Sequence, residues 1–85
     1  MDDDPIAEVE DTIRHFLRNE IGPAALETKS DAKLAEVGVD SVKVLRVVVN
    51  LERHYQIELE DDVIFRAETL RDLAKTIRAL VAGRA

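Results

Sequence analysis

The sequence contains no cysteine and no tryptophan. Without cysteine, the chain can form neither a disulfide framework nor a thiolate metal site, and it offers no cysteine nucleophile. Its two histidines, His15 and His54, are too few for a zinc site. We therefore expect a fold that depends on neither a cross-link nor a metal ion.

Long apolar runs and a basic leader are also missing. No stretch approaches the roughly 18 apolar residues that span a bilayer, and the first residues, MDDDP, are acidic where a secretory signal would be basic. The net charge of -6 disfavours nucleic acid, because phosphate contacts need clustered lysine and arginine. These features predict a soluble, cytoplasmic protein that binds neither nucleic acid nor a membrane, and we expect it to be a monomer.

The length of 85 residues supports a single domain, 1–85, with a core of about 5–82. Hydrophobic periodicity predicts an all-α fold, a small four-helix bundle with three main helices and one short helix. The first helix should begin at Asp4 and Pro5, a capping carboxylate followed by a residue suited to the first turn, and end at Asn19 or Glu20. Its expected buried face consists of Ile6, Val9, Ile13, Phe16 and Leu17.

A long loop is predicted between the first and second helices. It opens with the turn signal IGP, residues 21–23, in which glycine permits unusual backbone angles and proline fixes its own φ. A connection of about twenty residues is uncommon unless it packs on the domain or carries function. We expect one helical turn within 31–36, and apolar anchors at Ile21, Leu26, Leu34 and Val37.

The segment from Ser41 to about His54 is rich in valine, which would also suit a buried strand. The spacing of its polar residues favours a helix. They recur every three or four positions and would form one solvated stripe on a helix: Lys43, Arg46, Asn50 and Arg53. The segment is also locally basic. Residues 41–55 hold three basic side chains and one acidic, whereas residues 1–40 hold four basic and eleven acidic.

The last part of the chain is predicted to form one short and one longer helix. QIELE, residues 56–60, alternates like a strand but has no second strand to pair with, so we expect a loop that turns Ile57 and Leu59 inward. Thr69 and Asp72 predict a capping box, and Gly83 a helix end. The short helix should span 61–65 and bury Val63, Ile64 and Phe65, and the last helix should bury Leu70, Leu73, Ile77, Leu80 and Val81.

The stretch VGVDSV, residues 37–42, is the candidate functional site. Asp40 should cap the second helix and Ser41 should lie in its first turn, where N–H groups lack helical partners and the helix dipole is positive. A solvent-facing hydroxyl there could carry a phosphate ester in a favourable field. Asp40 either caps the helix alone or also helps to hold a metal ion during modification, and Gly38 permits the turn into the helix.

Three segments, VGVDSV, LRVVVNLERHYQIELEDDVIF and ETLRDLAKTI, resemble the acyl carrier protein family over Ile6 to Leu80. The hallmark of that family is a G-x-D-S-[LIV] stretch at the start of the second helix. The resemblance implies that a phosphopantetheinyl transferase attaches phosphopantetheine from coenzyme A to Ser41, within a motif that includes Gly38 and Asp40. The thiol of the arm would carry acyl groups as thioesters to acyl-loading and acyl-processing enzymes, such as synthases and transferases. The protein itself would be non-catalytic.

The basic second helix departs from the family's carriers of primary fatty acid synthesis, which present an acidic one. Lys43 and Arg46 instead predict partners with acidic or mixed surfaces, and favour polyketide or other specialised biosynthesis. Val44, Leu45 and Ile64 are candidates to line a site for the acyl chain, although ordinary core packing is favoured for each. The residues predicted to contact partners are Val42, Lys43, Arg46, Val49 and Arg53.

Three alternatives to the acyl carrier differ in the cargo or in the role of Ser41. A peptidyl or aminoacyl carrier would use the same arm; that branch commonly has histidine where Asp40 stands, so the carboxylate favours acyl cargo. An unmodified interaction module would use the apolar second helix to bind a partner. A serine enzyme with Ser41 as nucleophile is disfavoured, because the chain has no G-x-S-x-G motif and a bundle this small lacks a deep pocket.

Overall fold

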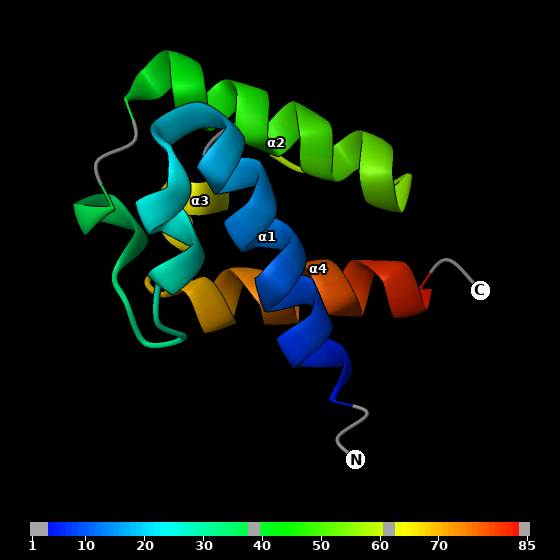
Figure 1. The fold of residues 1–85 in the computed structure, drawn as a ribbon. Coiled ribbons are helices and arrows are strands. Elements are labelled where there is room, and N and C mark those ends of the chain that lie inside the picture. Colours follow the sequence, from blue (N-terminus) through cyan, green and yellow to red (C-terminus); the bar gives the residue numbers. More distant parts are fainter. Residues whose placement is uncertain (1–3, 38–39, 61–62, 84–85) are drawn as a thin grey trace.

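A computed structural model describes residues 4–37, 40–60 and 63–83, with the backbone alone at Ser41 and Phe65. The described chain is helical and contains no strand, only an isolated bridge between Lys33 and Thr69. The predicted all-α fold, three main helices with one short helix and a long first connection, is confirmed (Figure 1). In chain order the elements are α1 (Pro5–Ile21), the 3-10 turns η1 (Pro23–Glu27) and η2 (Leu34–Glu36), α2 (Ser41–Tyr55), α3 (Val63–Arg66) and α4 (Leu70–Gly83).

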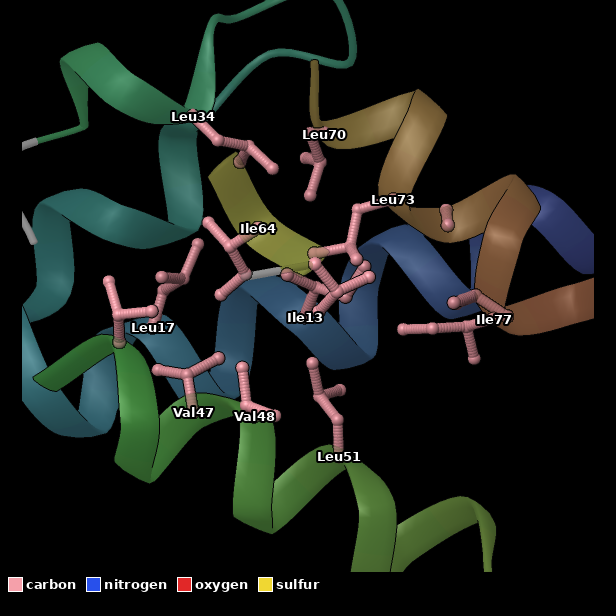
Figure 2. Close-up of a cluster of buried hydrophobic side chains, with 14 of the residues drawn as sticks. Ile13, Leu17, Leu34, Val47, Val48, Leu51, Ile64, Leu70, Leu73 and Ile77 are labelled. Carbon is pink, nitrogen blue, oxygen red and sulfur yellow. The ribbon is translucent and has the colours of Figure 1, made fainter. Parts of the chain in front are cut away.

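Helix α1 packs against both α2 and α4, which lie on opposite sides of it in Figure 1. Its buried positions recur about every four residues, so they form one stripe along the helix. Ile13 from α1, Leu51 from α2 and Leu73 from α4 point toward a common centre in Figure 2. The buried apolar core comprises Val9, Ile13, Leu17, Ala25, Leu34, Val44, Val47, Val48, Leu51, Val63, Ile64, Leu70, Leu73, Ala74 and Ile77.

The predicted helix starts are confirmed by their capping hydrogen bonds. Asp4 Oδ1 accepts from the Ile6 N–H at 2.9 Å. At α4, the Asp72 N–H donates to Thr69 Oγ1 at 3.1 Å while the Thr69 N–H donates to Asp72 Oδ2 at 3.3 Å, so each residue satisfies a backbone donor of the other.

The helix ends differ slightly from expectation. Helix α1 continues to Ile21 and stops at Gly22, whose φ of 99° favours glycine. Helix α4 includes Gly83, which we expected just beyond it. The sequence predicts the helix starts more accurately than the helix ends, because a capping side chain bonds to the backbone within a few residues.

The long connection packs against the core through its two 3-10 turns. Leu34 is buried, and Ile21 and Val37 are half-buried against the core, as predicted. The prediction for Leu26 is wrong, since its side chain is 40% exposed and Ala25 is buried instead. At three residues per turn, successive side chains point about 120° apart, so Leu26 faces away when Ala25 faces the core.

Backbone hydrogen bonds hold this connection against the start of α4. The Leu34 N–H donates to the Glu68 carbonyl at 3.1 Å, and the Arg71 N–H donates to the Ser30 carbonyl at 2.9 Å. Arg14 of α1 adds a side-chain bond from Nε to the Thr28 carbonyl at 2.6 Å. The connection is therefore fixed to two helices, and its η2 turn lies within the predicted range 31–36.

The chain after α2 also follows the prediction in most places. Ile57 and Leu59 are half-buried against the core, and Val63 and Ile64 of α3 are buried. The first two residues predicted for α3, 61–62, and the Phe65 side chain lie outside the described residues.

The prediction that Leu80 is buried is wrong, because its side chain is 40% exposed. The last turns of α4 extend past α1, which crosses the middle of α4 in Figure 1. Val81 keeps a half-buried contact with the core. Leu80 therefore belongs to the apolar pattern of the helix without having a helix to pack against.

One carboxylate, Glu10 of α1, lies in the interior at 3% exposure. Its Oε1 is 3.7 Å from Nη1 of Arg71, and its Oε2 has no hydrogen-bond partner among the described residues. Burial of a carboxylate is costly, and a single long ion pair offsets little of that cost.

Replacing Glu10 with methionine should therefore leave the free energy of unfolding unchanged or raise it. Arg71→Met, which leaves the buried carboxylate unpaired, should lower it by about 1–3 kcal/mol. Urea unfolding followed by circular dichroism measures both changes, with the exposed Arg78→Met of the same helix as a control expected within about 0.5 kcal/mol. A larger loss of unfolding free energy for Glu10→Met than for Arg71→Met would contradict the interpretation that the buried carboxylate is costly.

Candidate functional site

Asp40 caps α2, as predicted. Its backbone is extended, with φ -78° and ψ 173°, and its Oδ1 accepts from the Lys43 N–H at 2.9 Å. Its carbonyl accepts from the Val44 N–H at 2.8 Å. These two bonds determine that the helix begins at Ser41.

Ser41 is the first residue of a helix of 15 residues, whose dipole is positive at this end. The Ser41 side chain and the whole of Gly38 lie outside the described residues. The side chains of the flanking residues Asp40 and Val42 are exposed, so the start of the helix is open to solvent on both sides of the serine. A phosphodiester on residue 41 fits this setting, because the helix end favours an anion and the exposed neighbours leave room for an arm.

Helix α2 is apolar on two sides. Val44, Val47, Val48 and Leu51 are buried in the core. On the other side Val42, Leu45 and Val49 are exposed, to 59%, 46% and 39%. Of the three candidates to line an acyl site, Val44 and Ile64 are thus core residues, whereas Leu45 faces outward.

The outward side of α2 forms a shallow groove of about 450 Å³. Arg46 crosses toward the end of α1, where its Nη1 lies 3.4 Å from Oε1 of Glu20. Two arginines and one glutamate make the lining net basic. The groove is lined by Glu20, Val42, Leu45, Arg46, Val49, Asn50 and Arg53.

The structure brings together four of the five predicted partner-contact residues, Val42, Arg46, Val49 and Arg53, while the half-buried Lys43 lies outside the groove lining. The sequence pattern predicts Leu45 to be a core residue, but its side chain is exposed. The signal that could have identified it is the sheer apolar content of residues 42–51, which exceeds what one face of a helix can bury.

The two histidines belong to no metal-binding cluster among the described side chains. His15 and His54 are both exposed, and His54 makes edge contacts to the rings of Phe16 and Tyr55, at centroid distances of 5.7 Å and 4.7 Å. No three His, Cys, Asp or Glu residues in the described ranges are grouped so that they could hold a metal ion. None of the helices in these ranges has the length and apolar character to cross a membrane.

A family model described as "Phosphopantetheine attachment site" matches residues 11–77, most of the chain. The chain belongs to this family. Phosphopantetheine is accordingly its prosthetic group, and the resemblance to carrier proteins found in the sequence is confirmed. The comparison with curated proteins finds no match.

Solved structures of carrier proteins share the fold of this phosphopantetheine attachment domain. A free-standing peptidyl carrier protein from an Acinetobacter baumannii secondary metabolic pathway is 26% identical, with 87% of this chain and 92% of that one covered and a TM-score of 0.78. The 3,5-dioxohexyl ACP from the actinorhodin polyketide synthase in Streptomyces coelicolor is 26% identical, with coverages of 89% and 93% and a TM-score of 0.72.

A third structure, the A1-type ACP domain from module 5 of MLSA1, is 18% identical and shares the fold with a TM-score of 0.82, over 95% of this chain and 82% of that one. Acyl and peptidyl carriers thus both occur among the similar structures. The chain is a carrier domain of the phosphopantetheine type, a family that is generally non-catalytic.

The cap of α2 gives a prediction about stability. Asp40→Ala removes the acceptor of the Lys43 N–H and should lower the free energy of unfolding by about 1 kcal/mol. Asp40→Asn keeps an acceptor of similar capping strength and should cost only a few tenths of a kcal/mol. Urea unfolding distinguishes them, and an equal loss in both variants would mean that the carboxylate charge, not the cap, stabilises the helix start.

Proposed function

We propose that Ser41 carries the phosphopantetheine arm and that the chain is an acyl carrier protein of polyketide or other specialised biosynthesis. The observation that carries this proposal is that the family's attachment-site match includes a serine at the first position of a capped helix, between two exposed neighbours. The proposed attachment motif consists of Gly38, Asp40 and Ser41.

The chemistry follows from what the chain has and lacks. The Ser41 hydroxyl would form the phosphodiester, and the helix dipole would stabilise its negative charge. When bound, the arm supplies a terminal thiol for thioester chemistry, which a chain without cysteine cannot provide. Asp40 contributes by holding the start of α2, and the exposed groove of α2 would present an apolar surface to partner enzymes.

The charge of α2 supports specialised biosynthesis. Arg46 and Arg53 are exposed in the groove and Lys43 lies close by, so complementary partners would be acidic or mixed in charge. The similar actinorhodin carrier comes from a polyketide synthase, and the Asp40 carboxylate favours acyl cargo. Peptidyl cargo is the second candidate, favoured by the likeness to the free-standing peptidyl carrier protein.

The proposal extends to the setting of the carrier. We expect one domain over 1–85 with a core of about 5–82, monomeric, cytoplasmic and without catalytic activity of its own. A phosphopantetheinyl transferase would load it, and acyl-loading and acyl-processing enzymes such as synthases and transferases would act on its cargo. Neither nucleic acid nor a membrane is expected among its partners.

Loading with a broad-specificity phosphopantetheinyl transferase and coenzyme A tests the attachment site. The intact mass should increase by one arm, and Ser41→Ala should abolish the increase while circular dichroism keeps its helical signal. Ser30→Ala is the matched control, because Ser30 is the only other serine of the chain and should not affect loading. If the folded wild-type chain gains no mass, the unmodified interaction module replaces the carrier.

The basic side chains of α2 can be tested separately through docking. The double variant Lys43→Glu, Arg46→Glu should raise the KM for acyl transfer from the native loading enzyme about tenfold, because like charges would then face each other. Its free energy of unfolding should change by no more than about 1 kcal/mol, since the Arg46 side chain is exposed and its ion pair with Glu20 is long, at 3.4 Å.

The control for this experiment is Lys29→Glu, Arg78→Glu, which changes the net charge equally at two exposed positions away from α2. It should leave the KM within about twofold, because screened charges far from an interface have little effect. Equal KM values for the two double variants would show that α2 has no specific part in docking.

A further inference from the structure

A second groove lies between the segment after α2, helix α3 and helix α4. Its volume is about 620 Å³, and it shares no lining residue with the groove of α2. An adjoining hollow of about 520 Å³, lined in part by Glu58 and Leu80, continues it along the end of α4. All of its lining residues come after α2 in the chain, so it includes neither Ser41 nor the surface proposed above for docking of partner enzymes.

The floor and one wall of this groove are apolar. Val63 is buried at the floor, and Leu59 and Ala67 are half-buried against the core. Leu80 is 40% exposed and lines both the groove and the adjoining hollow. Because the core of α4 is already formed by other residues, Leu80 offers an apolar contact that the fold does not use.

The groove is held in shape by hydrogen bonds. Glu52 of α2 binds the segment that forms one wall. Its Oε2 accepts from the Leu59 N–H at 2.9 Å, and its carbonyl accepts from the Ile57 N–H at 3.1 Å. On the opposite wall, Asp72 is fixed by the capping box with Thr69. A groove that exists before binding spares a partner the cost of ordering it.

The charges around the groove are mostly acidic. Four exposed carboxylates face two exposed basic side chains, and one of these, Arg66, forms an ion pair with Glu60. The net charge of the lining is therefore negative, opposite in sign to that of the α2 groove. The charged lining residues are Glu58, Glu60, Arg66, Glu68, Asp72 and Lys75.

We propose that this groove binds a basic segment of a partner protein that inserts an apolar side chain against Leu80 and places lysine or arginine near Glu58 and Glu68. Such a partner could stay bound while enzymes act at α2, because the two grooves have no residue in common. A symmetric dimer through this face is disfavoured, since it would bring the same acidic rims together. The proposal goes beyond carriage of the arm and does not depend on it.

The probe is a short amphipathic peptide of lysine and leucine, titrated into the full-length chain and followed by amide NMR shifts. The largest shifts should fall on the described residues within 58–80. Glu58→Lys, Glu68→Lys should raise the Kd at least tenfold, whereas Glu27→Lys, Glu36→Lys, an equal charge change at exposed positions elsewhere, should raise it less than threefold. A glutamate–leucine peptide of the same pattern should not bind.

Leucine substitutions test the apolar contact with a control of equal exposure. Leu80→Ser should weaken binding of the lysine–leucine peptide about tenfold, and Leu26→Ser, also 40% exposed, should not. Shifts centred on α2, equal effects of the two leucine variants, or equal effects of the two charge variants would overturn the proposal. So would a self-association in sedimentation velocity that Leu80→Ser abolishes, because the occupant would then be a second copy of the chain.

Loading of the arm separates this proposal from the function proposed above. The variants at Glu58, Glu68 and Leu80 should accept phosphopantetheine as well as the wild type does, because these residues lie away from the start of α2. If the wild type binds the lysine–leucine peptide in this groove but is never loaded, the result supports binding in the groove and contradicts the proposed carrier function.

Discussion

The burial of one side of α2 against α1 is the contact on which the rest of the structure depends. Val44, Val48 and Leu51 enter the core and thereby fix the rotation of α2 about its axis. Since each helical residue turns the side chain by about 100°, Val42, Leu45 and Val49 must then point outward. The packing of α2 against α1 thus contributes to the stability of the domain and also creates the apolar surface beside the proposed attachment serine.

Local chemistry made parts of this structure predictable from sequence. Caps such as Asp4, Asp40 and the Thr69–Asp72 box bond to backbone atoms within three residues, so the sequence contains all the partners that they need. The family hallmark at Ser41 likewise lies within a few consecutive residues. These local features led to the correct fold class and to the carrier family.

The wrong predictions of buried leucines have a different cause. Leu26, Leu45 and Leu80 were all expected to be inward-facing or core residues, and all three are exposed. Periodicity indicates that a helix has an apolar side, but whether another element covers that side depends on the length and position of its neighbours. The exposed side chains of Leu45 and Leu80 each line a groove. The prediction of burial is therefore wrong at two positions where a partner could bind.

The two grooves differ in charge, although the whole chain has a net charge of -6. The α2 groove combines apolar side chains with Arg46 and Arg53, and the groove beside α4 combines them with exposed carboxylates such as Glu58 and Glu68. Grooves whose linings have opposite charges favour partners with opposite charges. These charges add specificity rather than fold stability. A small carrier could in this way distinguish an enzyme acting on its cargo from a protein that holds it in place.

Fragmentation of the loaded wild-type chain in the mass spectrometer tests attachment at Ser41 most directly. The added mass should be present in every fragment that contains Ser41 and absent from every fragment that does not, including those that carry Ser30. An added mass on Ser30 or on a threonine would contradict the assignment of the start of α2 as the attachment site.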